Sequence, residues 1–120
     1  MPFDWPRPVV AFQISARDKE KQQAFYSEMF DWDITQPDGS PIARIPPGKG
    51  PPEVGIGGTI VQTDRSAVLV YIQVAELDAS LAKAGELGGK TVLPRFDVPN
   101  GPTIAQIEDP EGNLIGLVQM

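Results

Sequence analysis

The chain has 120 residues, of which 41% are apolar and 22% are charged, and its formal net charge is −6 at pH 7. This size and composition predict a single globular domain and exclude a disordered tail and a membrane span. The acidic balance argues against a nucleic-acid partner, because phosphate binding requires a basic face. The chain has no His and no Cys, which excludes a Ser-His-Asp triad, a Cys-His nucleophile and an ordinary zinc site. Because the first ten residues lack the pattern of a secretory signal, we expect a cytoplasmic location.

The first half of the chain predicts a strand, a helix and three further strands. Residues 8–14 are β-branched and apolar, and residues 17–32 then change to helical spacing with Asp18 as the cap. Strand-like segments follow at 32–36, 42–46 and 54–62, separated by the turn signal PDGSP and the loop PPGKGPPE. One face of the predicted helix carries Gln22, Phe25, Tyr26, Met29 and Phe30.

The second half repeats this order. Residues 67–74 predict a strand, residues 76–89 predict a helix that ends in glycines, and three strands follow at 90–97, 102–108 and 113–119. Residues 10–14 match residues 68–72, and the pair Ile56-Gly57 matches the pair Ile115-Gly116. The order β-α-β-β-β therefore occurs twice, in modules of about 8–62 and 67–119.

Three segments carry a family resemblance: "VVAFQISARDKEKQQAFYSEMFDW", "LDASLAKAGELGGK" and "EDPEGNLIGLVQ". Together with the doubled order of elements, they resemble the vicinal oxygen chelate superfamily, which contains glyoxalase I, bleomycin-resistance proteins and extradiol dioxygenases. Within it, the sequence is most similar to small bacterial proteins related to lactoylglutathione lyase. The resemblance implies an α+β fold in which two βαβββ modules form a curved mixed sheet around a funnel. It also implies a homodimer, because relatives commonly dimerise.

The resemblance also locates the four metal ligands of the metal-using relatives, which are His or Glu side chains on the first and last strands of each module. At these positions the present sequence has Ala11, Gly57, Leu69 and Gly116, and none of them has a side-chain donor. Because a hard cation needs several oxygen ligands, we expect no metal ion and no other cofactor. This departure argues against glyoxalase and dioxygenase activity.

The funnel face is expected to form a ligand pocket instead. If Ala11 faces the funnel, strand alternation places Gln13, Leu69, Tyr71, Gln73 and Gly116 on the same face. Small residues there would leave volume for a small organic molecule in a largely apolar surface. The candidate ligand-binding residues are Ala11, Gln13, Trp32, Gly57, Leu69, Tyr71, Gln73 and Gly116.

Each candidate also has a plainer structural interpretation, and the sequence leaves both open. Trp32 is a wall of the pocket or a core residue. Gln13 and Gln73 are ligand contacts or solvated side chains. Gly57 and Gly116 leave space for a ligand, or allow a bend or the close approach of another strand.

Two functions compete. The first is a metal-independent protein that binds a small apolar or aromatic organic molecule, in the manner of the bleomycin-resistance branch. The alternative is an enzyme of the same superfamily, a lyase, isomerase or dioxygenase, with a metal-independent or rearranged site in which Tyr71 or a carboxylate carries a proton. No catalytic residue follows from the sequence.

Overall fold

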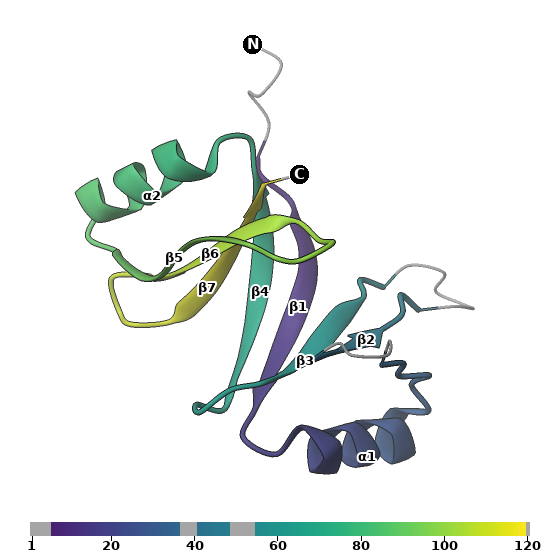
Figure 1. Ribbon diagram of the computed structural model, residues 1–120. Helices are drawn as coiled ribbons and strands as arrows, with labels where there is room; N and C mark the ends of the chain where they lie inside the picture. Colours follow the sequence, from purple (N-terminus) through teal and green to yellow (C-terminus); the bar gives the residue numbers. More distant parts are fainter. Residues whose placement is uncertain (1–5, 37–40, 49–54, 120) are drawn as a thin grey trace. The chain divides into compact units, whose positions relative to one another are not determined.

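The computed structural model describes residues 6–36, 41–48 and 55–119 (Figure 1). Its contacts divide the chain into two compact units. The N-terminal unit comprises Ala11–Leu69, and the C-terminal unit comprises the residues up to Val10 together with those from Val70 onwards. Each unit combines one helix with a sheet of parallel and antiparallel strand pairs, which confirms the predicted α+β class.

The N-terminal unit holds most of β1 (Val9–Ala16), followed by α1 (Lys19–Phe30), β2 (Ile42–Ile45) and β3 (Gly58–Gln62). Its strand order is β2-β3-β1, with β3 parallel to β1 and antiparallel to β2. This register brings together the buried core of the unit, which consists of Ile14, Ala16, Ala43, Ile45 and Ile60.

The C-terminal unit holds most of β4 (Ala67–Val74), followed by α2 (Leu77–Glu86), β5 (Lys90–Asp97), β6 (Thr103–Glu108) and β7 (Leu114–Gln119). Its strand order is β4-β7-β6-β5, with β7 parallel to β4 and antiparallel to β6. The buried core of this unit consists of Val74, Leu77, Ala105 and Leu117.

All predicted elements of the second half are confirmed, with small differences at their ends, whereas two strands of the first half differ. The segment 32–36 forms only one bridge, between Thr35 and Arg44. The strand predicted for 54–62 begins at Gly58, and Val54 lies outside the described residues.

The predicted apolar face of α1 is only partly buried. Tyr26 packs against the core of the N-terminal unit, but Phe25, Met29 and Phe30 are 56%, 62% and 50% exposed. The buried residue of this helix is Lys19. Neither helix of the described part has the length and apolar content needed to cross a membrane.

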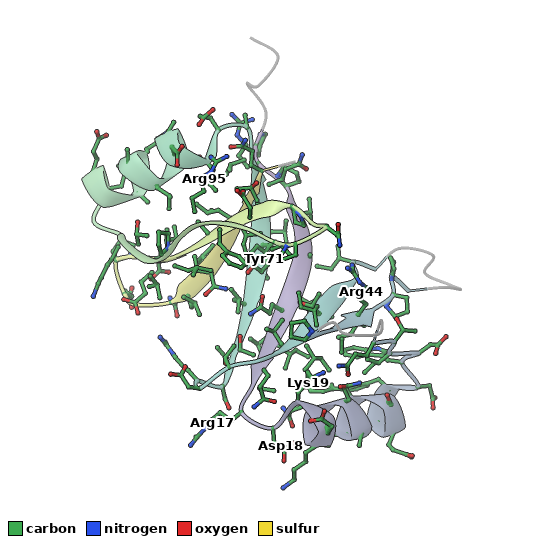
Figure 2. The ribbon with its side chains drawn as sticks, in the orientation of Figure 1. Arg17, Asp18, Lys19, Arg44, Tyr71 and Arg95 are labelled. Atoms are coloured by element: carbon green, nitrogen blue, oxygen red, sulfur yellow. The ribbon has the colours of Figure 1, made fainter. Side chains whose placement is uncertain are left out.

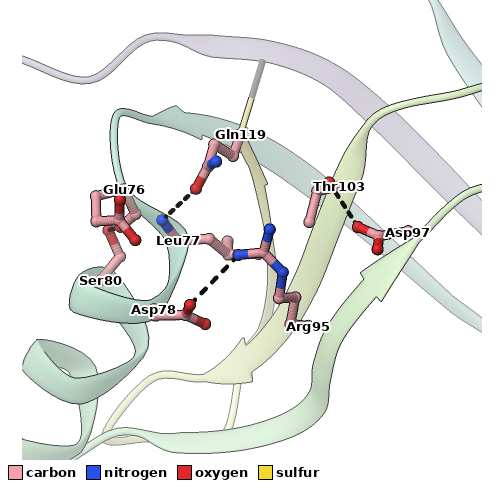
Figure 3. A network of polar contacts seen from close by, with 8 residues as sticks. All are labelled: Glu76, Leu77, Asp78, Ser80, Arg95, Asp97, Thr103 and Gln119. Carbon is pink, nitrogen blue, oxygen red and sulfur yellow. Dashed lines mark hydrogen bonds and ion pairs between the residues drawn. The ribbon is translucent and has the colours of Figure 1, made fainter.

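A glutamine from the last strand holds the first turn of the helix in each unit. Gln62 Oε1 accepts a hydrogen bond of 2.9 Å from the Lys19 backbone N–H, and Gln119 Oε1 accepts one of 2.7 Å from the Leu77 backbone N–H (Figure 3). The first N–H groups of a helix have no partner within the helix, so these bonds cap it. In α1, Asp18 also accepts from the Lys21 backbone N–H at 3.1 Å, which confirms the predicted cap.

The α2 surface is tied to the sheet by a further contact, the ion pair of Arg95 on β5 with Asp78 at 3.3 Å (Figure 3). Both partners are substantially exposed, so this pair adds little to stability. The glutamine caps and the buried cores are therefore the main attachments of each helix.

The first residue of each helix is buried, but it is a charged residue type in α1 and an apolar one in α2. Lys19 is 5% exposed and Leu77 is 0% exposed. The buried Lys19 Nζ has no hydrogen-bond partner among the described residues. Because a buried charge without a partner is costly, Lys19 destabilises the N-terminal unit at the position where Leu77 stabilises the other.

Replacing Lys19 with leucine should therefore stabilise the protein. We expect the free energy of unfolding in urea to rise by roughly 1–3 kcal/mol for Lys19→Leu, because the variant no longer buries an unpaired polar group. The exposed Lys83 of α2 provides the control, and Lys83→Leu should change stability by less than about 0.5 kcal/mol. A Lys19→Leu variant that is less stable than the parent would show that the ammonium has a partner.

The turn between β6 and β7 is organised by Asp109. Its carboxylate accepts hydrogen bonds of 2.9 Å from the backbone N–H groups of Glu111 and Asn113 and from Asn113 Nδ2. Gly112 has a φ of 89°, a left-handed conformation that glycine adopts without strain. The hydrogen bonds from Asn113, first from its side chain and then from its backbone, hold the pKa of Asp109 below its ordinary value of 3.8.

This lowered pKa predicts a pH-dependent contribution to stability. The ionised form of Asp109 is favoured in the folded state, so its contribution is present above pH 3.8 and is lost as the pH falls below the folded pKa. Asp109→Asn should therefore be less stable than the parent in urea at pH 7, and the difference should shrink at pH 3. Asp64→Asn, at another exposed turn residue, should show no such trend. A stability difference that is independent of pH would contradict this role of the carboxylate.

Candidate functional site

The C-terminal sheet has one face that its helix does not cover, and we call it the helix-free face. Ile72, Ile107 and Leu117 pack with α2 in the core. Because side chains alternate along each strand, Tyr71 and Gln73 on β4, Gln106 on β6 and Gly116 on β7 lie on the opposite face. Alternation therefore places Tyr71, Gln73 and Gly116 on the side that the sequence predicted.

Tyr71 and Gly116 are paired directly across the β4–β7 ladder. A Cβ atom built on Gly116 would overlap the Tyr71 ring, with Cγ only 2.7 Å away. The glycine therefore allows the ring to lie against β7. The predicted open volume at Gly116 is wrong, because the Tyr71 ring occupies that space and Tyr71 is only 7% exposed.

The Tyr71 hydroxyl is held by Gln106, whose Nε2 donates a hydrogen bond of 3.0 Å to it. Figure 2 labels Tyr71 on the sheet. Burial raises the pKa of Tyr71 above its ordinary value of 10.0, against a smaller lowering effect of the Gln106 hydrogen bond. The hydroxyl is therefore neutral at physiological pH. Around the Tyr71 ring, the helix-free face thus presents a neutral phenol and amide groups.

Gln106 was missed as a site residue by sequence reasoning. The signal was available, because Gln106 lies directly opposite Gly116 in the β6–β7 hairpin. Counting back from the DPEG turn, with one face already assigned, would have placed it on the same face.

In the N-terminal unit, Gln13 lies on the side of β1 away from α1. Its neighbours Phe12 and Ile14 pack on the helix side, as predicted. Gln13 is buried and its Nε2 donates a hydrogen bond of 2.9 Å to Ser15 Oγ, so it is not a solvated side chain. Ala11 lies on the same face by alternation, and Leu69 on β4 is buried. Ligand contact by these residues stays a prediction.

Gly57 is small for a structural reason. A Cβ atom at this position would lie 2.7 Å from the Ile45 carbonyl oxygen and 3.2 Å from two atoms of Pro47. Ile45 and Pro47 therefore lie too close to Gly57 for a larger residue at this position. This is one of the two interpretations that the sequence left open for Gly57.

Trp32 packs as a core residue, which is one of the two interpretations that the sequence left open, and its role as a wall of the funnel stays a prediction. Its ring stacks on Tyr26 with a centroid distance of 5.4 Å and an interplanar angle of 8°, and it packs against the core of the N-terminal unit. It also lines a groove of about 880 Å³, shared with Phe12, Phe30 and Arg44.

The residues at the family's ligand positions do not fit a metal ion. Gly116 is covered by a phenol ring and Gly57 lies against a backbone carbonyl. In residues 6–36, 41–48 and 55–119, no group of three or more Asp and Glu side chains is arranged to hold a metal ion.

The two units, each with a helix on one face of a mixed sheet, define an α+β protein with a duplicated module. A family model described as a glyoxalase-like domain matches residues 10–118. The chain belongs to this glyoxalase-like family, which confirms the resemblance seen in the sequence.

Curated relatives share about a quarter of their residues with this chain. A glyoxylase-like domain-containing protein of Didymella fabae is 27% identical over 112 residues, and the match covers 88% of each chain. CFP32 of Mycobacterium bovis, which is named as a glyoxylase, is also 27% identical, over 123 residues. This match covers 88% of the present chain but only 43% of that relative, so the chain spans less than half of its length.

Solved structures show the same fold at lower identity. A glyoxalase/bleomycin resistance protein/dioxygenase superfamily member from Vibrio splendidus 12B01 has a TM-score of 0.64 at 12% identity, covering 96% of this chain and all of that chain. A methylmalonyl-CoA epimerase, solved with methylmalonyl-CoA, has a TM-score of 0.63 at 14% identity, covering 94% of each chain.

The contact between Gly116 and Tyr71 can be tested by a double-mutant cycle. Gly116→Ala should destabilise the protein by roughly 1–3 kcal/mol in urea unfolding, because the added methyl group displaces the ring. In the Tyr71→Ala background the same substitution should cost much less. Gly85→Ala is the control, because no atom lies within 4 Å of a Cβ built there, in a helix. Additive effects of Gly116→Ala and Tyr71→Ala would contradict the contact.

Proposed function

We propose that this glyoxalase-like chain binds a small organic molecule with an apolar or aromatic part on the helix-free face around Tyr71, without a metal ion at the family's ligand positions. The observation that carries the proposal is the Tyr71 ring against Gly116. The resemblance implies a metal ligand at position 116, and a phenol ring lies there instead. A metal ion bound in the family's manner would require that ring to move.

The composition of the helix-free face supports an organic ligand. Around Tyr71, alternation places the apolar residues Ile104, Leu114 and Val118. Gln73 and Gln106 supply amide groups beside the neutral hydroxyl. A mostly apolar surface with a few placed polar groups is typical of small-molecule sites.

An enzyme with a metal-independent or rearranged site is the second candidate, and the hydrogen-bonded Tyr71 hydroxyl is the observation that favours it. A proton carrier works best when its pKa lies near the working pH. Burial moves the pKa of Tyr71 further above neutrality. This direction favours binding over proton transfer.

A thermal-shift screen of metabolites and aromatic antibiotics tests the proposal, and methylmalonyl-CoA belongs in it because a structure of the same fold binds that molecule. For a compound that stabilises the parent, Tyr71→Phe should weaken binding about tenfold, because a hydrogen bond is lost. Tyr26→Phe, the other tyrosine of the chain, should bind as the parent does. A compound recovered unchanged supports binding, and a consumed compound supports the enzyme.

Two results would contradict the proposal. The first is an equal loss of affinity in both tyrosine variants. The second is a stoichiometric divalent ion, found by elemental analysis, in protein purified without added chelator.

A further inference from the structure

A groove in the C-terminal unit lies between α2 and the sheet, on the face opposite to Tyr71, and we call it the α2 groove. Its volume is about 510 Å³, within the range of roughly 300–1,000 Å³ that is usual for small-molecule sites. Its floor is apolar and is formed by three residues of the hydrophobic core, Val74, Ile107 and Leu117. One wall is a face of α2, with Ala79, Ser80, Lys83 and Ala84. The α2 groove therefore reaches the core and is separate from the helix-free face.

The α2 groove exists because α2 has a small residue where α1 has a large one. Tyr26 is the eighth residue of α1, and Ala84 is the eighth residue of α2. In the N-terminal unit the Tyr26 ring stacks on Trp32 and packs against the core, so it fills space between the helix and the sheet. In the C-terminal unit the methyl group of Ala84 lines the open groove instead. Because both units follow one packing scheme, the open space corresponds to the place of an aromatic side chain.

Charged residues at the α2 groove favour an acidic group on the ligand. Those that line it are Arg7, Glu76, Lys83, Glu108 and Asp109. Alternation places the Glu108 side chain on the helix-free face, and the Asp109 carboxylate accepts the hydrogen bonds of its own turn. Glu76 lies about two helical turns before Lys83. A ligand carboxylate at the Lys83 end of the groove would therefore lie beside a cation.

We propose that the α2 groove binds a small organic acid with one aromatic ring. The ring lies on the apolar floor, in the place that Tyr26 fills in the other unit, and the carboxylate lies at Lys83. Burial of the ring supplies most of the affinity, because aromatic rings bury a large apolar area. This site goes beyond the function proposed above and does not depend on it, since it lies on the other face of the sheet.

Phenylacetate is a suitable probe, because it consists of one aromatic ring and a carboxylate. In an NMR titration it should bind the parent saturably, at roughly millimolar concentration or below. The amide signals that shift should be those of α2, Ile107 and Leu117, whereas those of Gln73 and Gly116 on the helix-free face should stay unchanged. This readout locates the site without any substitution. Absence of saturable binding, or shifts confined to the helix-free face, would overturn the proposal.

Filling the α2 groove tests where the ring lies. Ala84→Tyr gives α2 the residue that α1 has at the same place, so the new side chain should occupy the groove and abolish phenylacetate binding. Ala82→Tyr is the matched control, because Ala82 is exposed on α2 and does not line the groove, and this variant should bind as the parent does. Cooperative unfolding in urea checks that both variants are folded. Parent-like binding by folded Ala84→Tyr would contradict the proposal.

A change of charge tests where the carboxylate lies. Lys83→Gln should weaken phenylacetate binding about threefold, as expected for an exposed ion pair. The same variant should bind phenylacetamide, which has no charge, as the parent does. An equal loss for both compounds, or no loss for phenylacetate, would contradict the contact with Lys83. Tyr71→Phe should leave phenylacetate binding unchanged, so the proposal for the helix-free face can fail separately.

Discussion

The side-chain amides of Gln62 and Gln119 attach each helix to the last strand of its own unit. Each amide oxygen accepts the first helical N–H, at Lys19 or Leu77. Each bond fixes the end of a strand to the first turn of a helix that is far away in the sequence. The helix is thereby held on one face of the sheet. The opposite face is left for other chemistry. The repetition of this bond in both units also shows that the duplicated sequence pattern reflects a duplicated packing scheme.

On the face that α2 leaves uncovered, Gly116 and Tyr71 pack directly against each other. Only glycine is small enough at position 116 of β7 to leave room for the Tyr71 ring. Once the ring is there, burial keeps its hydroxyl neutral and Gln106 fixes its position. The same strand position therefore cannot combine this arrangement with a metal-ligating side chain. The fold around this contact is that of glyoxalase-like proteins.

Local patterns predicted the elements and faces well, because alternation and turn chemistry act over a few residues. Ile14 and Ile72 pack on the helix side as the period of two requires. Contacts between side chains on different strands were harder to predict from the sequence. The Tyr71–Gln106 bond spans 35 residues, and the filling of space at Gly116 depends on a neighbouring strand. The close approach of Ile45 to Gly57 likewise joins two separate segments of the chain. None of these contacts is marked within its own segment.

The burial of Lys19 has the same origin, and it shows how far the two helices have diverged within one scheme. In α2 the core side carries Leu77 and Leu81, as an amphipathic surface helix should. In α1 the core side carries Tyr26 and the buried Lys19, whose Nζ has no hydrogen-bond partner among the described residues, while Phe25 and Met29 are exposed. Packing inside its own unit does not account for this inverted distribution, because moving apolar residues inward would bury more apolar surface and fewer polar atoms.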